Sequence, residues 1–263
     1  MLIPKTMNFY WGGESLSFLQ YMTIVSFNKF NPTWKIIVHT PIEVSNEITW
    51  ATGEQNKQYT GKDFFCDLKE VPNVSINVID FNKIGFYNQA PEVFKSDYFR
   101  WYLLSTNGGG WSDIDILYLK SIDELLTSNI ETVICFGEYG NIIGFLMSKP
   151  NNPFFKRLFD NSFRYFNHLD YQSIGSKLMN IFYPREMDIL YEFPATKNLD
   201  MSTFYKINHL NIEDLFYNNK IDIINDDVFG VHWYNGSDIA KDFNNQYPNT
   251  TNCTINEILK RIL

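Results

Sequence analysis

Three consecutive glycines, at positions 108 to 110, constrain the fold more than any other feature, because they separate a predicted helix from a predicted strand. Upstream, Ser96 is a suitable N-cap for a helix whose apolar side continues to Leu104. Three glycines cannot sustain that helix, and they permit the positive φ angles that a sharp reversal of the chain needs. Asp113 and Asp115 follow. The segment therefore predicts a helix, a tight turn and two carboxylates at the mouth of a strand.

The chain around this segment alternates between helix and strand patterns. A buried strand at residues 3–11 precedes an amphipathic helix at 15–30 and a strand at 34–39, which is the opening of a Rossmann-like sheet. Further strands are predicted at 74–81, 116–119, 132–136 and 141–147, and a loop at 41–73. We expect an α/β fold, with a Rossmann-like mixed sheet flanked by helices in a single domain. Residues 1–240 would form that domain, and 241–263 a C-terminal loop and short helix packed on it.

Four polar side chains of the central segment can meet one ligand. Asp97 and Arg100 lie three positions apart, so they share one face of the predicted helix. Asp113 and Asp115 lie two apart, so in a strand both carboxylates project to one side and can bind one cation, while Ile114 turns into the core. An Asp-x-Asp triplet alone is expected roughly once by chance in a chain of this length. A pair of solvated turn carboxylates is therefore the alternative for the triplet alone.

The composition narrows the class of partner. The 263 residues carry a net charge of −8, which argues against nucleic acid as the main partner. A nucleoside diphosphate remains compatible, because a divalent cation and one or two basic residues can neutralise it locally. The three cysteines show no metal-ligand spacing and are expected to be reduced thiols. Since no apolar run has the length of a signal peptide or a membrane span, we expect a cytoplasmic protein.

The end of the first predicted strand is a candidate ligand contact. In an open α/β sheet, ligands bind beyond the carboxyl ends of the strands, and Trp11, Gly12 and Gly13 stand at such an end. The indole of Trp11 could stack on a nucleobase, and the glycines would let a ligand approach the backbone closely. The alternative is that Trp11 is a core residue. His39, at the end of the next strand, is more simply interpreted as structural than as catalytic.

A second aromatic segment, residues 229–237, contains His232. A neutral imidazole is a good ligand for Mn²⁺, so His232 could complete the coordination begun by the two aspartates. Trp233 and the residues up to Ser237 could then close over a diphosphate as a flexible lid. The alternative for this segment is an irregular aromatic turn.

Together these segments resemble the DxD sugar-transferase family, which includes initiating α-mannosyltransferases and is related to the large glucosylating bacterial toxins. The family pattern joins a Ser-Asp-x-x-Arg segment to a pair of glycines and an Asp-x-Asp triplet. This sequence supplies Ser96, Asp97, Arg100, Leu104, Gly109, Gly110, Asp113 and Asp115. It departs from the pattern at the usual tyrosine, where it has Trp111-Ser112. Relatives also open with Ile-Pro-Lys and end the catalytic domain with a His, Trp and Gly-Ser element.

The resemblance implies a GT-A fold and a metal-dependent glycosyltransferase. Such an enzyme moves a sugar from a UDP- or GDP-linked nucleotide-diphosphate donor to a glycan, surface-polymer or other hydroxyl acceptor, with retention of configuration. The implied cofactor is Mn²⁺ or Mg²⁺, held by Asp113, Asp115 and His232. The implied catalytic residues are Asp113, Asp115 and Arg100. The implied donor-binding residues are Tyr10, Trp11, Gly12, Asp97, Arg100, Asp113, Trp233 and Ser237.

Two other functions use the same residues. The first is a non-catalytic protein that binds a nucleotide sugar or a glycan on the same fold. The presence of all three metal-ligand candidates argues against it, because a binding protein would be free to lose them. The second is a hydrolase of nucleotide sugars, which the same metal site would serve. Only a rate that an acceptor stimulates separates this hydrolase from a transferase.

Overall fold

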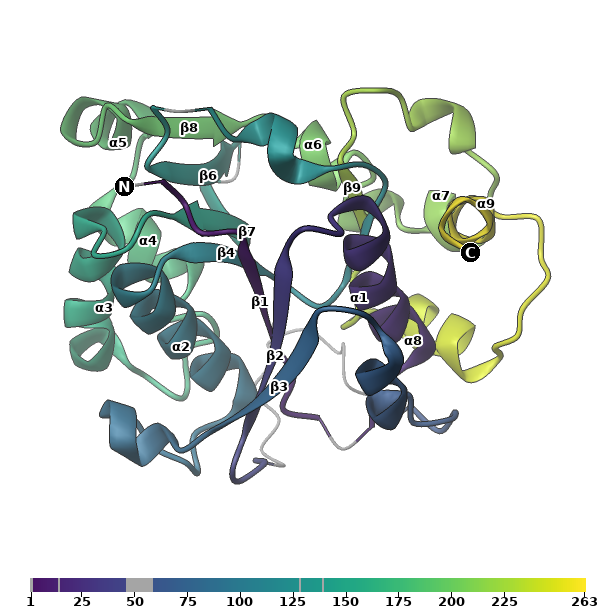
Figure 1. The fold of residues 1–263 in the computed structure, drawn as a ribbon, viewed down its shortest axis with the longest axis horizontal. Helices are drawn as coiled ribbons and strands as arrows, with labels where there is room; N and C mark the ends of the chain where they lie inside the picture. The colour runs from purple at the N-terminus through teal and green to yellow at the C-terminus, as the bar shows by residue number, and fades with distance from the viewer. Residues whose placement is uncertain (1, 14, 46–58, 128, 139) are drawn as a thin grey trace.

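A seven-stranded mixed sheet forms the centre of the computed structural model, in the order β3-β2-β1-β4-β7-β6-β8 (Figure 1). The structure describes residues 2–13, 15–45, 59–127, 129–138 and 140–263. Four neighbouring strands are parallel: β3 (Val74–Ile79), β2 (Lys35–Pro41), β1 (Thr6–Tyr10) and β4 (Gly109–Ser112). The other three are β7 (Gly140–Ser148), antiparallel to β4 and to β6 (Thr132–Gly137), and β8 (Thr196–Leu199), parallel to β6.

Helices flank this sheet on both sides. On the left of Figure 1 lie α2 (Glu92–Thr106), α3 (Pro153–Tyr165) and α4 (Ser176–Phe182). On the right lie α1 (Phe18–Phe30), α8 (Asp238–Asn245) and α9 (Thr254–Ile262). The shorter helices are α5 (Glu186–Glu192), α6 (Ser202–Tyr205) and α7 (Glu213–Phe216). The 3₁₀ helices of the described residues are η1 (Phe65–Glu70), η2 (Phe81–Ile84), η3 (Ile122–Leu125), η4 (His209–Asn211) and η5 (Ile221–Ile223).

The helix α1 illustrates how local sequence and packing agree. It begins at a capping box, in which the side chains of Ser17 and Gln20 each accept a hydrogen bond from the other residue's backbone amide. Its Phe27 packs edge-on against Phe9 of β1 and against Trp34, within the apolar cluster on this side of the sheet. A second cluster lies between the sheet and α2 to α4, and a third joins α1 to α8 and α9. The sheet is therefore buried from both sides around β1 and β4.

A small second sheet completes the region around the predicted site. β5 (Ile116–Tyr118) follows β4 after a short turn and pairs antiparallel with β9 (Gly230–His232), so that Ile116 lies opposite His232. α1 packs on β5, since the amide of Tyr118 donates to the Ser26 hydroxyl at 3.0 Å. This pairing places β9 against the turn that carries the two aspartates.

The edge of the sheet where ligands bind in open α/β folds lies between β1 and β4. The chain passes from β1 to β2 on one side, whereas β4 pairs with β1 on the other, with Asn8 opposite Trp111. The strand order therefore reverses at β1, which makes the carboxyl end of this strand a topological switch point. Because β1 and β4 are parallel, Trp11 and Asp113 leave the sheet at the same edge.

The structure confirms the predicted mixed α/β sheet and corrects the boundaries of the central segment. α2 begins at Glu92 after Pro91, so Ser96 lies inside the helix, and its prediction as the N-cap is wrong. Pro91 opens the helix one turn earlier because its fixed φ suits a helix start. The reversal lies at Gly108 and Gly109, whose φ angles are 67° and 95°. β4 already begins at Gly109.

The two aspartates consequently lie in a turn and not in one strand. Asp113 follows the last residue of β4, and Asp115 precedes the first residue of β5. The alternation argument that joined their carboxylates does not apply to this turn. The expected burial of Ile114 is found, with 8% of its surface exposed.

Other expectations concern the two ends of the chain and the loop after β2. The expected domain boundary at residue 240 falls within α8, and α9 packs into the third apolar cluster through Ile255, Ile258 and Ile262. Residues 46–58 of the predicted loop lie outside the described part of the chain. Among the described helices, none combines the length and apolar character that crossing a membrane requires.

Candidate metal and donor site

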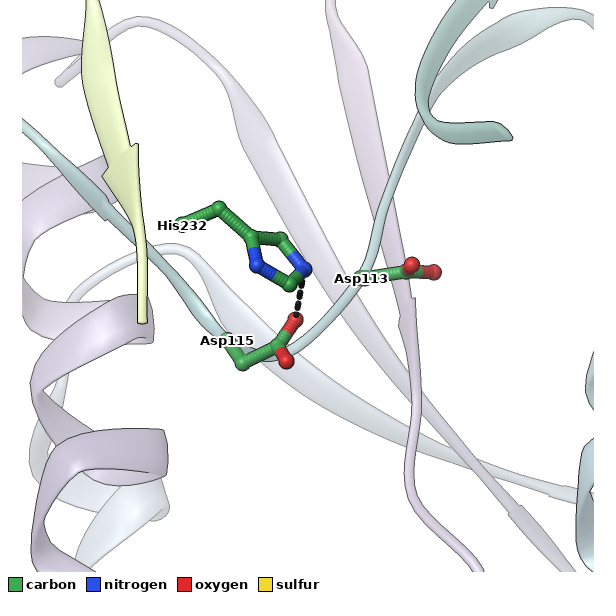
Figure 2. Close-up of side chains that lie close together, drawn as sticks. All are labelled: Asp113, Asp115 and His232. Carbon is green, nitrogen blue, oxygen red and sulfur yellow. Dashed lines mark ion pairs between the residues drawn. The ribbon is translucent and has the colours of Figure 1, made fainter. Parts of the chain in front are cut away.

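Asp113, Asp115 and His232 converge at the carboxyl edge of the sheet. One ligand atom from each lies within 4.8 Å of the others, although His232 is distant from the aspartates in sequence. Figure 2 shows the imidazole of His232, at the end of β9, directed toward Asp115, with Asp113 on the same turn of chain. Two carboxylates and an imidazole suit a divalent cation such as Mn²⁺. The donor set therefore fits the cation that the sequence predicts.

Asp115 forms an ion pair with His232 in this structure. His232 Nε2 lies 3.1 Å from Asp115 Oδ1, and the amide of Asn235 donates to Asp115 Oδ2 at 2.9 Å. Burial raises the pKa of Asp115, but its interactions with His232 and Asn235 outweigh burial, so the pKa lies below its usual range. Burial lowers the pKa of His232, but the charge of Asp115 outweighs it and raises that pKa. These two shifts favour an ionised Asp115 beside a protonated His232 when no cation is bound.

Asp113 has a different partner. Arg100 of α2 donates from Nη2 to Asp113 Oδ1 at 3.0 Å, and Trp111 donates to the same oxygen from its indole at 3.3 Å. The guanidinium of Arg100 also lies over the Trp111 ring, 5.0 Å from its centroid. The tryptophan that departs from the family pattern thus contacts both residues. Asp113 Oδ2 is not used in these contacts, and the side chain of Asp113 is 33% exposed.

Asp97 lies on the other side of Arg100. Its Oδ1 is 3.4 Å from Arg100 Nη1, and both side chains are almost completely buried. Burial raises the pKa of Asp97 from 3.8 to about 7, against the opposing attraction of Arg100. Asp97 Oδ2 and Arg100 Nε have no hydrogen-bond partner among the described residues. The expected juxtaposition of Asp97 and Arg100 on one helix face is present, and it leaves polar atoms for a ligand to satisfy.

At the end of β1, a carboxylate from α2 occupies the space beside Gly12. The Tyr10 hydroxyl donates to Glu92 Oε2 at 2.6 Å, and the buried Lys95 donates to Glu92 Oε1 at 2.7 Å. A β-carbon on Gly12 would lie 1.8 Å from Glu92 Oε2. The sequence predicts that a ligand approaches the backbone closely at Gly12. In the structure, the carboxylate of Glu92 makes that close approach. Trp11 is half-buried and packs against the first core cluster.

Two residues predicted to contact the donor make contacts within the protein in this structure. Trp233 is completely buried, and its indole donates to the Thr23 hydroxyl at 3.2 Å. The indole packs in the third core cluster, which leaves none of its surface exposed for the predicted donor contact. Ser237 caps α8, with its hydroxyl accepting from the amide of Ala240 and donating to the Tyr234 carbonyl. The segment forms β9 and a helix cap, and Asn235 binds Asp115 through its backbone.

His39 is structural, as expected. Its Nε2 lies 2.9 Å from Asn8 Oδ1 and its Nδ1 lies 3.0 Å from Asn77 Nδ2, so both ring nitrogens are bonded. Burial lowers the pKa of His39 to about 3, which keeps it neutral. It lines a cavity of about 850 Å³ over β1 to β3 that excludes Asp113, Asp115 and His232. This cavity is therefore separate from the metal-ligand candidates.

Sequence reasoning missed several residues that shape the site. Glu92 precedes Lys95 by three positions, a helical ion-pair spacing that could have revealed them. Tyr205 of α6 and Gly144 of β7 carry no such signal, because long stretches of chain separate them from the aspartates. The carbonyl of Gly144 accepts a 2.7 Å hydrogen bond from the amide of Asp113. These residues reach the site only through the fold.

Comparisons with known proteins concern the fold and the segment that carries the two aspartates. Residues 23–131 match the family described as the glycosyltransferase sugar-binding region containing the DXD motif. Similarity to the PaToxG glycosyltransferase covers 73% of this chain and 70% of that chain, with 17% identity and a TM-score of 0.50. Similarity to the glycosyltransferase GlyE of Streptococcus pneumoniae TIGR4 covers 99% of this chain and 60% of that chain, with 12% identity and a TM-score of 0.55. The curated proteins give no sequence match.

These likenesses bear on different parts of the molecule. The family match includes Asp97, Arg100, Asp113 and Asp115, and it ends before His232. The structural likenesses, at low identity, show the fold. The chain spans 60% of the length of the GlyE chain. Residues 23–131 are similar to the DXD-containing sugar-binding region of glycosyltransferases, and the chain has a GT-A type fold.

Proposed function

We propose that this chain is a metal-dependent glycosyltransferase that uses a UDP- or GDP-linked sugar as donor and a glycan, surface polymer or other hydroxyl compound as acceptor. The observation that carries the proposal is the convergence of Asp113, Asp115 and His232 within 4.8 Å at the edge of the sheet. That edge includes the switch point at which α/β folds bind nucleotides. The retaining outcome and the choice of Mn²⁺ or Mg²⁺ are part of the proposal and come from the family resemblance.

The proposed cation is held by Asp113 and Asp115 through their carboxylates and by His232 through Nε2. When bound there, it supplies Lewis-acid stabilisation of the negative charge on the leaving diphosphate. Asp115 and His232 have to separate to bind it, and His232 has to lose its proton. Asp113 already offers a free oxygen, because Arg100 and Trp111 use only Oδ1.

The remaining residues bind the donor in this proposal. Arg100 keeps its charge beside Asp113, and its unpaired Nε is available to a phosphate or sugar oxygen. The unpaired Oδ2 of Asp97 can accept from a sugar hydroxyl. Trp11 stands at the end of β1, where its ring can stack on the nucleobase. We assign no nucleophile and no general base.

A thermal-shift panel tests the donor and the cation together. UDP, GDP and their sugar derivatives are added to the protein with and without Mn²⁺. A ligand at a hundred times its dissociation constant stabilises the folded state by about 2.7 kcal/mol, which is readily detected. We expect one base to raise the melting temperature only with Mn²⁺ present. If no nucleotide shifts the melting temperature in any metal condition, the proposal is wrong.

Turnover of the donor that binds separates the transferase from the alternative functions. A transferase releases the nucleoside diphosphate faster when a hydroxyl acceptor is added. A hydrolase releases it at a rate that no acceptor changes. A binding protein shows the thermal shift and releases none.

A further inference from the structure

Tyr205 brings an additional polar group to the proposed cation site. It is the last residue of α6, which is tied to the residue before β9 because the amide of Phe229 donates to the Thr203 carbonyl at 2.8 Å. The ring of Tyr205 packs on the imidazole of His232, with 5.1 Å between their centroids. Tyr205 lies outside the segment that matches the family, and no sequence pattern identifies it.

The hydroxyl of Tyr205 has no hydrogen-bond partner among the residues that the structure describes. The residue is 9% exposed, and its oxygen is completely buried without a hydrogen bond to any described residue. Buried hydroxyls are normally hydrogen-bonded, because leaving one unpaired costs on the order of 1–3 kcal/mol. The unpaired hydroxyl therefore indicates a partner that is present only in another state of the site.

Gly144 shows which group lies near this hydroxyl. A β-carbon at position 144 would lie 2.3 Å from the Tyr205 hydroxyl oxygen and 2.9 Å from Asp113 Oδ2. Both oxygens therefore occupy space that only a glycine leaves free, on the same side of β7. Asp113 Oδ2 is the oxygen that Arg100 and Trp111 leave unused. A hydrogen-bond donor and a free carboxylate oxygen thus share one small space.

We propose that Tyr205 is a positioning residue for Asp113. When Asp113 binds a divalent cation, the Tyr205 hydroxyl donates a hydrogen bond to its carboxylate, directly or through one water molecule, and fixes its orientation. Groups that hydrogen-bond to metal ligands typically change metal affinity by about 10- to 100-fold when they are removed. This inference rests on the proposed function, because it requires the cation site.

The test compares Tyr205→Phe with the unaltered protein. Free Mn²⁺ is measured by electron paramagnetic resonance during a titration, which gives the dissociation constant without any activity assay. We expect the constant to rise about tenfold in Tyr205→Phe. The melting temperature without metal should stay the same or rise, because the lost hydroxyl has no partner there and the ring contact with His232 remains.

Tyr183→Phe is the matched control, since Tyr183 is a buried tyrosine whose ring packs on Phe154, away from the aspartates. It should leave the Mn²⁺ dissociation constant unchanged. If Tyr205→Phe binds Mn²⁺ as tightly as the unaltered protein, while Asp115→Ala has lost binding, the role of Tyr205 is refuted and the cation site stands. A lower melting temperature of metal-free Tyr205→Phe would also refute it. If the unaltered protein binds no Mn²⁺, both this inference and the proposed function fail.

Discussion

The two aspartates of the Asp-x-Asp triplet are held by different cations. Asp113 is paired with Arg100, and a guanidinium is a permanent cation in proteins. Asp115 is paired with His232, whose charge depends on a proton. Arg100 lies on α2, within the residues 23–131 that match the glycosyltransferase family model. His232 lies on β9, late in the chain and outside that match.

This difference assigns different tasks to the two carboxylates. A metal ion cannot displace the charge of Arg100, so Asp113 stays oriented by α2 and offers only its second oxygen. The same ion can replace the proton of His232, after which Asp115 and His232 are both free to act as ligands. The His232 side is therefore where the site changes on binding, and the Arg100 side is where it stays fixed.

Replacement of Asp115 by alanine should have the largest effect. It removes a direct ligand, so we expect metal-dependent turnover to fall by about 10³-fold or more, which corresponds to several kcal/mol of lost stabilisation of charge. Initial rates at saturating Mn²⁺ measure it. Folding should change little at pH 8, where a histidine left without its carboxylate is neutral.

The matched control is Asp160→Ala, which removes an aspartate from a surface pair with Lys156. Its turnover should equal that of the unaltered protein. Near-normal turnover in Asp115→Ala would remove this residue from the site.

Replacement of Arg100 by methionine should mainly reduce stability. It leaves Asp97 and part of Asp113 buried without a cation, and breaking a buried pair in this way typically costs about 3–5 kcal/mol. Urea denaturation at pH 8 gives the free energy of unfolding. The loss should be smaller at pH 5, where Asp97 is protonated, since its pKa is about 7.

His232→Gln is the comparison variant on the other side of the site. It removes a group whose charge depends on a proton, so its free energy of unfolding at pH 8 should fall by much less than that of Arg100→Met. Equal losses for the two variants would contradict the distinction between a fixed side and a changeable side.

Replacement of Asp97 by asparagine should have a smaller effect, of the opposite sign. Because folding raises the pKa of Asp97 from 3.8 to about 7, the protonated form is favoured in the folded state. Its contribution to stability is complete below pH 4 and is lost as the pH rises through 7. Asparagine stays neutral, so at pH 8 the variant should be more stable by roughly 1–2 kcal/mol.

Melting temperatures between pH 4 and pH 8 measure this difference, which should disappear toward the acid end. A variant that is less stable than the unaltered protein at pH 8 would show that Asp97 is a favourable ionised partner of Arg100.

The sequence predicted those parts of the fold that depend on local pattern. Strand and helix periodicities located β1, α1, β2 and the β6–β7 hairpin, and the spacing of Asp97 and Arg100 correctly predicted a shared helix face. The start of α2 was missed because Ser96 resembles a cap, whereas Pro91 opens the helix earlier. β8 was missed because a four-residue strand gives almost no periodic signal.

The candidate site was less predictable, because its geometry depends on contacts between distant segments. His232 was named from its chemistry, and only the pairing of β5 with β9 places it beside Asp115. Trp233 was assigned to the donor as part of a lid over the diphosphate, but its indole lies in the core and bonds to the Thr23 hydroxyl. Tyr205 and Gly144 needed the structure, since neither has a sequence signal.

The most direct test of the central claim is the number of protons released when Mn²⁺ binds. It is measured by isothermal titration calorimetry in buffers of different ionisation enthalpy, at pH 6 and at pH 8.5. His232 has a raised pKa, so it is mostly protonated at pH 6 in the metal-free protein. We predict release of about one proton per Mn²⁺ at pH 6, fewer at pH 8.5, and none from the His232→Gln variant. Binding of Mn²⁺ at pH 6 without proton release, or no binding at all, would contradict the account.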